Sequence, residues 1–330
     1  MQKLHNTNKL FASIDVGTNT LRLLIAKPNK GNRIFQTIYE AQDICRLGEG
    51  IESTSFISQE AEERTLKVLK RYTDKINSLQ VRYVKAVSTS VLRRARNSKE
   101  FVERVRGETG LSINIISGEE EARLTSIGVL TSLKMGQVDS VIIMDIGGGS
   151  TELIKVRDKQ TQPEMVVSFD IGVVVLTERY LISDPPTKEE MECLFKHIDN
   201  YVGDICSCFN LNSTHNLLVG TAGTLTTLAS ISQKMQVYNP SLINNYVLFY
   251  DEIESVFKRL LSLSKNERSV RIQGLEKGRE DIIVAGIAIL LVIMRKFSFS
   301  SVTVIDTGLR EGMMIDLIRT EQGSNQQFSF

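Results

Sequence analysis

The sequence predicts an α/β protein built from two similar domains. The chain has 330 residues, and domains of about 150 residues are typical. Apolar runs of strand length alternate with segments of helical periodicity along the whole chain. One strand-turn-strand pattern also occurs twice, at a domain-sized interval. We place the two domains at residues 1–134 and 135–330, with the last helix able to pack back on the first domain.

The repeated pattern is a buried strand that ends in an acid and is followed by a small turn and a second strand. In the first copy the strand Leu10–Val16 leads to the turn Gly17-Thr18-Asn19-Thr20. In the second copy Val141–Ile146 leads to three glycines, Ser150, Thr151 and Glu152. At one constant offset (145 − 15 = 130), the matching residues are Asp15 and Asp145, Gly17 and Gly147, Thr20 and Ser150, and Leu23 and Leu153.

The second turn has the composition of a phosphate-binding loop. A chain that turns on Gly147, Gly148 and Gly149 can aim several backbone N–H groups into one concavity, which suits a phosphate. Asp145 and Glu152 flank that concavity, and carboxylate oxygens there suit Mg²⁺ beside phosphate oxygens. The competing interpretation is a glycine-rich hairpin between two core strands, because short glycine motifs often occur without function. The repeat favours the phosphate interpretation.

The rest of the first domain alternates strands and helices. Ser58 precedes an acidic first turn and an apolar helical face, and Ser117 has capping-box spacing to Glu120. The expected elements are strands at Ile34–Gln42, Val81–Val87 and Leu111–Ile116, and helices from Ser58, from Ser98 to Thr109 and from Ser117 to Leu133. Glu121 is one turn into the last helix, where its carboxylate would project near the strand ends. The alternative is that this acidic run only compensates the helix dipole.

A basic segment follows the strand Val81–Val87. Residues 82–106 contain eight basic and two acidic side chains. Arg93, Arg94 and Arg96 come directly after the strand end, and guanidinium groups pair bidentately with phosphate oxygens. For Arg94 and Arg96 we favour the alternative, a solvated basic helix face.

The second domain contains a further candidate loop. Leu217–Val219 runs into Gly220-Thr-Ala-Gly-Thr224, and glycines and hydroxyls between a strand and a helix start favour an anion or nucleotide site. The other expected elements are strands at Thr151–Val156, Met165–Phe169 and Val302–Ile305, and helices from Thr187, at Asp251–Leu263, at Arg279–Phe297 and ending at about Arg319.

Composition excludes several classes of protein. The 40 basic and 39 acidic residues predict no general attraction to nucleic acid or to anionic membranes. The start resembles no signal peptide, and the longest apolar stretch, Ile282–Met294, is too short to span a bilayer. Four cysteines without metal-ligand spacing predict structural thiols in a reducing cytoplasm. Three histidines argue against a Ser-His-Asp or zinc enzyme.

Together these stretches resemble the exopolyphosphatase / guanosine pentaphosphate phosphohydrolase (Ppx/GppA) family, from Phe11 to about Asp316. The motifs that carry the resemblance are Asp15–Thr20, Ser88–Arg93, Ser117–Leu124, Asp145–Glu152, Gly220–Thr224, Arg279–Asp281 and Gly308–Gly312. The resemblance implies two actin-like (ribonuclease-H-like) domains with an interdomain cleft. It also implies the short, two-domain form, because longer members continue into a C-terminal helical module.

The resemblance also implies roles for individual residues. Glu121 matches the family's catalytic base, Arg93 matches the arginine near the phosphate, and Asp145 and Glu152 match the acids associated with Mg²⁺. The phosphate loops correspond to Gly17, Thr18, Asn19 and Thr20, and to Gly147, Gly148, Gly149 and Ser150; further cleft candidates are Asp15, Gly223, Thr224 and Arg279. Two positions depart from the family, with Val175 standing where an arginine is usual and Val91 where alanine is preferred.

The expected activity is release of terminal orthophosphate from inorganic polyphosphate by Mg²⁺-assisted attack of a water that Glu121 deprotonates. Guanosine pentaphosphate (pppGpp) presents the same terminal phosphoanhydride and is the alternative substrate. Two rival functions are an actin-like sugar or acid kinase and a non-enzymatic nucleotide-binding protein. We expect no nucleic-acid or membrane partner, allow for a homodimer, and expect a cytoplasmic protein.

Overall fold

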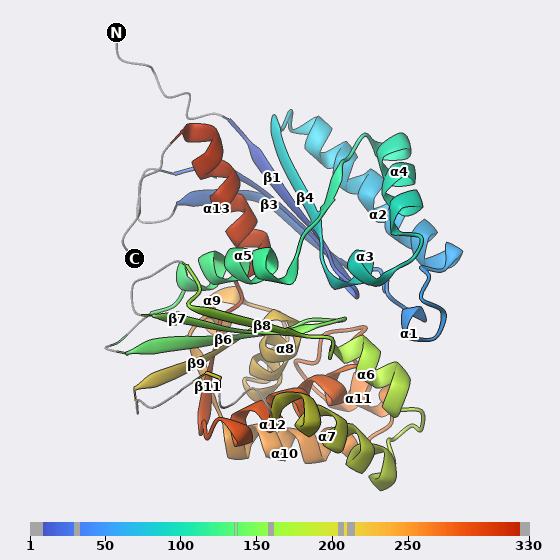
Figure 1. Ribbon diagram of the computed structural model, residues 1–330, viewed down its shortest axis with the longest axis vertical. Helices are drawn as coiled ribbons and strands as arrows, with labels where there is room; N and C mark the ends of the chain where they lie inside the picture. The colour runs from blue at the N-terminus through green and yellow to red at the C-terminus, as the bar shows by residue number, and fades with distance from the viewer. Residues whose placement is uncertain are drawn as a thin grey trace. The chain divides into compact units, whose positions relative to one another are not determined.

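The computed structural model describes residues 9–29, 34–134, 136, 138–157, 162–203, 208–209 and 215–323. The chain divides into two compact units. Unit 1 holds the residues up to Gly128 together with those from Leu309 onward, and unit 2 runs from Val129 to Gly308. Each unit contains one mixed β-sheet with helices packed on it (Figure 1). The predicted α/β class with two domains is therefore confirmed.

Unit 1 has a five-stranded sheet in the order β3-β2-β1-β4-β5. The first three strands form an antiparallel meander, and β4 and β5 continue the sheet parallel to β1. The strands are β1 (Phe11–Val16), β2 (Thr20–Pro28), β3 (Phe35–Ile44), β4 (Tyr83–Ser88) and β5 (Ile113–Ile115). The helices are α1 (Ile51–Thr54), α2 (Gln59–Ser78), α3 (Ser90–Arg94), α4 (Ser98–Thr109), α5 (Gly118–Leu130, which ends in unit 2) and α13 (Leu309–Gln322). The carboxyl ends of β1, β4 and β5 thus lie along one edge.

Helices cover both faces of this sheet. Ile14 and its alternate neighbours in β1 pack with α2, whose buried face includes Leu69 and Tyr72. Phe11 points to the opposite face, because successive side chains of a strand alternate, and it packs with Met314 of α13. The Ser58 hydroxyl accepts a hydrogen bond from the Ala61 N–H at 3.2 Å, as expected of the N-cap of α2.

A half-buried ion-pair network joins α13 to β4 and α5. Asp316 accepts hydrogen bonds from Lys85 at 2.8 Å and from Arg123 at 2.9 Å, and Arg123 also donates to Glu120 at 2.7 Å. Burial of Asp316 raises the pKa of its carboxyl, but the hydrogen bonds from Lys85 and Arg123 outweigh burial and hold the pKa below its usual value. The charged form of Asp316 therefore stabilises unit 1.

We expect the Asp316→Asn variant to lose this contribution. A carboxyl with a depressed folded pKa stabilises the protein above its unfolded pKa of about 4, and this stabilisation disappears as the pH falls through the folded pKa. The free energy of unfolding should drop by about 2 kcal/mol at pH 7, and the difference from wild type should shrink below about pH 4. Denaturant unfolding across this pH range measures it, with Glu321→Gln, an exposed acid on the same helix, as the control. A difference that does not change with pH would contradict the assignment.

Unit 2 repeats the same plan with one added strand, in the order β10-β11-β9-β6-β7-β8. Strands β6, β7 and β8 form an antiparallel meander, β9 and β11 continue parallel to β6, and β10 is an antiparallel edge strand. The strands are β6 (Ser140–Ile146), β7 (Thr151–Arg157), β8 (Met165–Phe169), β9 (Asn216–Thr221), β10 (Tyr246–Phe249) and β11 (Ser301–Val304). The helices are α6 (Val173–Tyr180), α7 (Lys188–Gly203), α8 (Ala222–Ser232), α9 (Pro240–Ile243), α10 (Tyr250–Leu261), α11 (Lys265–Arg271) and α12 (Ile283–Lys296).

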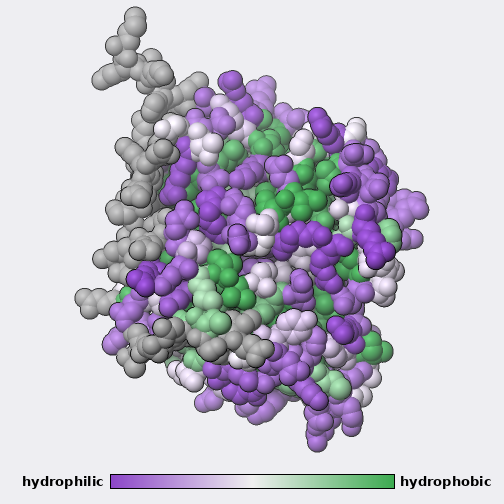
Figure 2. All heavy atoms as spheres, viewed as in Figure 1, coloured by the Kyte–Doolittle hydropathy of each residue, from purple (hydrophilic) through white to green (hydrophobic). Residues whose placement is uncertain are grey.

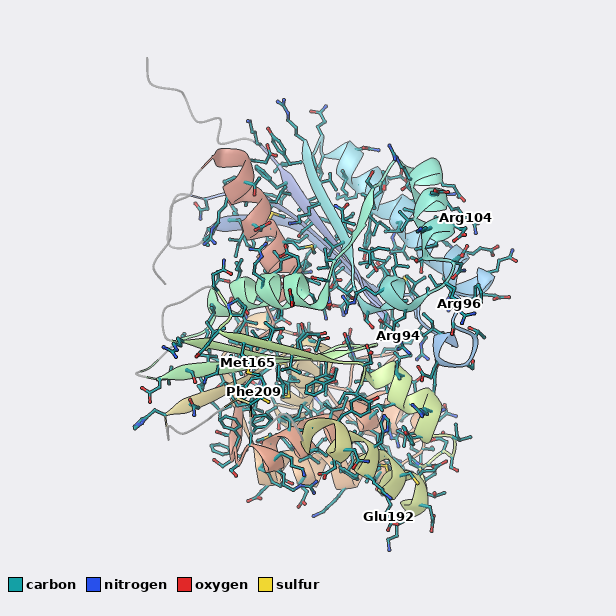
Figure 3. All side chains as sticks on the ribbon, in the orientation of Figure 1. Arg94, Arg96, Arg104, Met165, Glu192 and Phe209 are labelled. Carbon is teal, nitrogen blue, oxygen red and sulfur yellow. The ribbon has the colours of Figure 1, made fainter. Side chains whose placement is uncertain are left out.

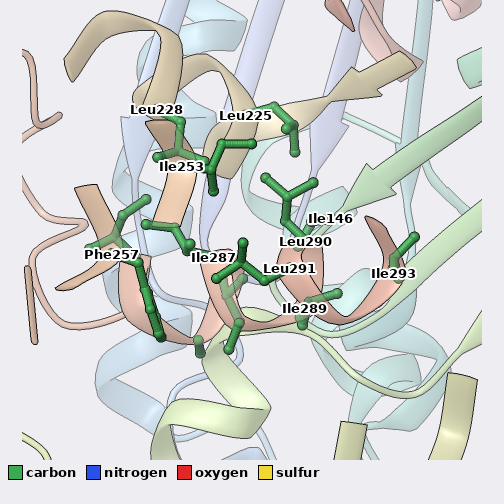
Figure 4. Packing of buried hydrophobic residues seen from close by; sticks show 14 of the residues in the cluster. Ile146, Leu225, Leu228, Ile253, Phe257, Ile287, Ile289, Leu290, Leu291 and Ile293 are labelled. Carbon is green, nitrogen blue, oxygen red and sulfur yellow. The ribbon is translucent and has the colours of Figure 1, made fainter. Parts of the chain in front are cut away.

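The core of unit 2 is built around α12. Every residue from Ile283 to Met294 is buried, and Figure 4 shows Ile287, Leu290 and their neighbours packed with Leu225 of α8 and Phe257 of α10. Each such fully buried side chain contributes roughly 1.5–3 kcal/mol. The helix that we expected to start at Arg279 starts at Ile283 instead. Gly278 has a φ of 88° and the chain turns through the next four residues before the helix begins.

Within the described parts of the chain, no helix combines the length and the apolar character needed to cross a membrane. The face of the molecule seen in Figure 2 is covered mostly by hydrophilic side chains, with small groups of apolar residues between them.

Candidate functional site

The turn between β1 and β2 is held from both sides. The Gly17 N–H donates to the Thr20 carbonyl at 3.1 Å, and the N–H groups of Cys45 and Gly48 donate to the carbonyls of Asn19 and Thr18. The N–H groups of Thr18 and Asn19 have no acceptor among the described residues. The buried Asn19 Oδ1 likewise accepts no hydrogen bond from any described residue. Buried N–H groups are rarely left unpaired. The turn therefore presents two consecutive backbone N–H groups of the kind that bind anions.

Glu121 and Arg93 meet at the same edge of the unit 1 sheet. Arg93 is on α3, which follows β4, and Glu121 is in the first turn of α5, which follows β5. Nη1 of Arg93 donates to Glu121 Oε2 at 2.8 Å and to the Ile116 carbonyl at 2.9 Å. Glu121 is only 7% exposed. A buried carboxylate bonded to a guanidinium therefore lies at the carboxyl ends of parallel strands, where α/β proteins commonly bind ligands.

The turn between β6 and β7 in unit 2 is closed by the same hydrogen bond as its partner in the repeat. The Gly147 N–H donates to the Ser150 carbonyl at 2.9 Å, and the carbonyls of Gly147 and Gly148 accept from the N–H groups of Val173 and Val174 at the start of α6. The N–H groups of Gly148 and Gly149 have no acceptor within the described ranges. Each half of the sequence repeat thus folds into a hairpin turn that offers two consecutive N–H donors to a ligand.

Asp145 and Glu152 lie side by side beneath this second turn. They are directly opposite each other in the β6–β7 register, so their Cβ atoms are about 4.5–5.5 Å apart on one face of the sheet. Glu152 is 1% exposed, and its Oε1 accepts a hydrogen bond from the Ser168 hydroxyl at 2.8 Å. Like charges in directly opposed positions are unfavourable, and a cation would stabilise the pair.

Asp145 and Glu152 supply two carboxylates to a candidate ligand set. Across the described residues, no group of three or more His, Cys, Asp and Glu side chains is placed to hold a metal. Mg²⁺ is usually held by one or two carboxylates together with waters and substrate phosphates. The donor set of Asp145 and Glu152 therefore fits Mg²⁺.

The third candidate loop follows β9 in unit 2. The Arg279 guanidinium lies against Gly223, since a Cβ added there would be 2.1 Å from its Nη1, and Arg279 also donates to Glu276. Thr224 is buried at 3% exposure and packs closely on Gly286 of α12. Gly223 and Thr224 lie in the first turn of α8, which directly follows β9. Because β9 is parallel to β6, this turn lies at the same sheet edge as the Gly147–Ser150 turn.

Comparison with known proteins decides the family. Residues 24–321 match the model of the Ppx/GppA phosphatase family. The chain belongs to this family. The resemblance inferred from the sequence motifs is confirmed.

Several known proteins are similar to this chain over most of its length. A bifunctional 3-dehydroquinate synthase/phosphatase from Fusobacterium nucleatum is 34% identical over 89% of this chain, and the chain spans 44% of that relative's length. Exopolyphosphatase 2 from Mycobacterium tuberculosis is 29% identical over 93% of this chain and 98% of its own. A crystal structure of the Ppx/GppA family member from Aquifex aeolicus has a TM-score of 0.80 and 34% identity, covering 96% of this chain and 99% of that one.

Two other arginines of the basic segment in this Ppx/GppA chain pair with acids other than Glu121. Arg94 donates to Glu52 at 2.5 Å and Arg104 to Glu62 at 3.0 Å. Figure 3 shows Arg94 and Arg96 near α3 and Arg104 on α4. Val175, where the resemblance led us to expect arginine, is buried in α6.

Three residues that sequence reasoning missed support the site. The Ser88 hydroxyl donates to the Val16 carbonyl at 2.7 Å and so ties β4 to the start of the first turn. Ser168 holds Glu152, and Gly172 packs flat on the second turn, where an added Cβ would lie only 2.3 Å from the Gly148 carbonyl oxygen. Ser88 and Gly172 fall within or beside the family motifs, whereas no local pattern singles out Ser168.

Proposed function

We propose that this chain is an exopolyphosphatase that releases terminal orthophosphate from inorganic polyphosphate. The observation that carries the proposal is the unit 1 sheet edge, where the buried Glu121 carboxylate is bonded to Arg93 and the nearby turn has two N–H groups with no acceptor among the described residues. Membership of the Ppx/GppA phosphatase family and the similarity to an exopolyphosphatase support it.

The proposed chemistry needs positioning and charge stabilisation more than covalent catalysis. In phosphoryl transfer, charge is spread over the phosphoryl oxygens, so fixed N–H donors and a guanidinium lower the barrier. The N–H groups of Thr18 and Asn19 and the Arg93 guanidinium would supply these donors. Glu121 would accept the proton of the attacking water. The water oxygen bonds to the terminal phosphorus while the bond from that phosphorus to the bridging oxygen breaks, and the bridging oxygen stays with a polyphosphate that is one unit shorter.

We also propose that Asp145 and Glu152 hold Mg²⁺. The bound ion would neutralise charge on phosphate oxygens. The N–H groups of Gly148 and Gly149 would bind phosphate oxygens beside it. Ser168 would keep the Glu152 carboxylate in the orientation that the ion requires, as outer hydrogen-bond partners of metal ligands commonly do.

Ser168→Ala is therefore expected to weaken Mg²⁺ binding. Loss of an outer hydrogen-bond partner typically costs 10- to 100-fold in metal affinity, so we expect about a tenfold higher half-saturating Mg²⁺ concentration. Calorimetric titration of the protein with MgCl₂ measures it without turnover. Glu164→Gln removes an acid that pairs with Arg157 near the other end of β7 and should leave Mg²⁺ binding unchanged. Equal affinity in wild type and Ser168→Ala would remove Glu152 from the proposed ligands.

A comparison of substrates tests the proposed function. Purified protein with Mg²⁺ is assayed for kcat/KM of phosphate release from long-chain polyphosphate and from pppGpp. We expect polyphosphate to be preferred, and a preference for pppGpp by about tenfold or more would overturn this choice. ATP-dependent phosphorylation of a sugar or short acid, or retention of ADP without turnover, would point to one of the two rival functions instead.

A further inference from the structure

The Arg93 guanidinium makes both of its side-chain contacts through one nitrogen. Nη1 donates to Glu121 Oε2 and to the Ile116 carbonyl, which uses both of its N–H groups. A guanidinium carries five N–H donors in one plane. Among the described residues Nε and Nη2 contact no acceptor, so three donors remain. The Arg93 side chain is 24% exposed and the Glu121 side chain 9%, so the guanidinium is the more accessible partner.

We propose that Arg93 positions the Glu121 base with Nη1 while its remaining N–H groups bind the phosphoryl group. This inference rests on the proposed hydrolase function and adds a second task to a residue matched so far only to phosphate binding. A single rigid plane that touches both groups fixes the distance between the base and the phosphorus. The attacking water then has one place to bind, adjacent to both.

The backbone around Arg93 makes this arrangement rigid. The Arg93 N–H donates to the Thr89 carbonyl at 3.2 Å, and the Ile116 N–H donates to the Ser88 carbonyl at 3.0 Å. The Ser88 hydroxyl in turn donates to the Val16 carbonyl. These bonds connect the ends of β1, β4 and β5 to the pair. The backbone of Glu121 is also fixed at the start of α5, since its N–H donates to the Ser117 carbonyl at 2.9 Å.

Lysine cannot replace arginine in this double role. A lysine ammonium keeps the positive charge but is a point donor without a planar fork. Arg93→Lys should therefore retain attraction for phosphate and lose the fixed orientation of Glu121. A misplacement of about 1 Å can cost roughly 100-fold in rate. The loss is expected mainly in kcat, with a smaller change in KM.

A double-mutant cycle separates positioning from phosphate binding. Arg93→Lys is measured in the wild-type and in the Glu121→Gln background, with polyphosphate of defined length. We expect Arg93→Lys to lower kcat by about 100-fold in the wild type and by less than about threefold beside Glu121→Gln, because no base is left to position. The KM change should persist in both backgrounds. Arg94→Lys, on the same helix but bonded to Glu52, should leave kcat unchanged.

Equal fold losses of kcat in the two backgrounds would overturn the inference and leave Arg93 as a phosphate ligand alone. A second measurement does not depend on turnover. Nitrogen-15 NMR should show separate Nη signals for Arg93 in the wild type, because Glu121 and the Ile116 carbonyl both hold Nη1, and the Nη1 signal should shift in Glu121→Ala, where only the bond to Ile116 remains. If the wild type releases no phosphate, the proposed function fails, and the NMR comparison still decides whether Glu121 holds Arg93. Unchanged Arg93 signals in Glu121→Ala would refute the contact.

Discussion

Glu121→Gln is expected to lower kcat for phosphate release from polyphosphate by about 10²–10⁴-fold, the range for loss of a general base. Glutamine has almost the same shape as glutamate and can still accept the hydrogen bond from Arg93, so the fold and the phosphate donors should be retained. What it cannot do is take a proton from water. Steady-state kinetics measures the loss, and calorimetry should show polyphosphate binding with an affinity close to that of the wild type.

The neighbouring acids of α5 provide the control for this variant. Glu119 is exposed on the first turn of the same helix, so Glu119→Gln removes an equal charge from the same helix N-terminus. Its kcat should remain close to that of the wild type. If Glu121→Gln turned over polyphosphate at a near wild-type rate, Glu121 would have to be removed from the mechanism, whatever its burial.

The sequence predicted the hairpin turns well because local chemistry determines them. The N–H groups of Gly17 and Gly147 each donate a hydrogen bond to the carbonyl oxygen of the residue three positions later. A Cβ added at either glycine would lie about 3 Å from that oxygen. The glycine, the hydroxyl residue and the preceding acid that define each turn therefore lie within a few residues of one another in the sequence. The same holds for Ser58, whose hydroxyl caps the following helix as its spacing indicates.

Features that depend on distant partners could not be predicted from the sequence. The helix start at Ile283 is four residues later than expected, because Gly278 and Arg279 lie in a turn where Arg279 packs against Gly223. The pairing of Arg93 with Glu121 joins residues 28 positions apart. Ser168 bonds to Glu152 only because β8 lies beside β7. In the last two cases the deciding contact comes from sheet order, which no short motif encodes, and in the first it comes from a turn that packs against the start of α8.

The two copies of the repeat have the same strand pairing, but the charges of the facing residues at the strand ends differ. In unit 2 the acid at the strand end faces a second acid, Asp145 opposite Glu152. In unit 1 the equivalent pair is Asp15 opposite Arg22, so opposite charges face each other there. The Mg²⁺ site proposed in unit 2 therefore draws on two facing carboxylates, whereas the hairpin of unit 1 has one.

Gly172→Ala is expected to disable the second turn. The Gly172 φ of −119° is accessible to alanine, so the problem is space: the new Cβ would lie 2.3 Å from the Gly148 oxygen and 2.4 Å from the carbonyl carbons of Gly148 and Gly149. Backbone atoms cannot rotate away as a flexible side chain can, so the turn has to shift. We expect a loss of about 1–3 kcal/mol in the free energy of unfolding and about a 100-fold lower rate of phosphate release.

Gly203→Ala tests whether this effect is specific to the turn. Gly203 ends α7 in the same unit, and a Cβ there would meet only Lys296 Nζ at 3.9 Å. Because alanine is the better helix former by roughly 0.5–1 kcal/mol, this control should be as stable as the wild type or more so, with full activity. Denaturant unfolding and kinetics on both variants decide the matter. Should Gly172→Ala match the control in both, the second turn would tolerate displacement, and the N–H groups of Gly148 and Gly149 would then not be the donors that hold phosphate.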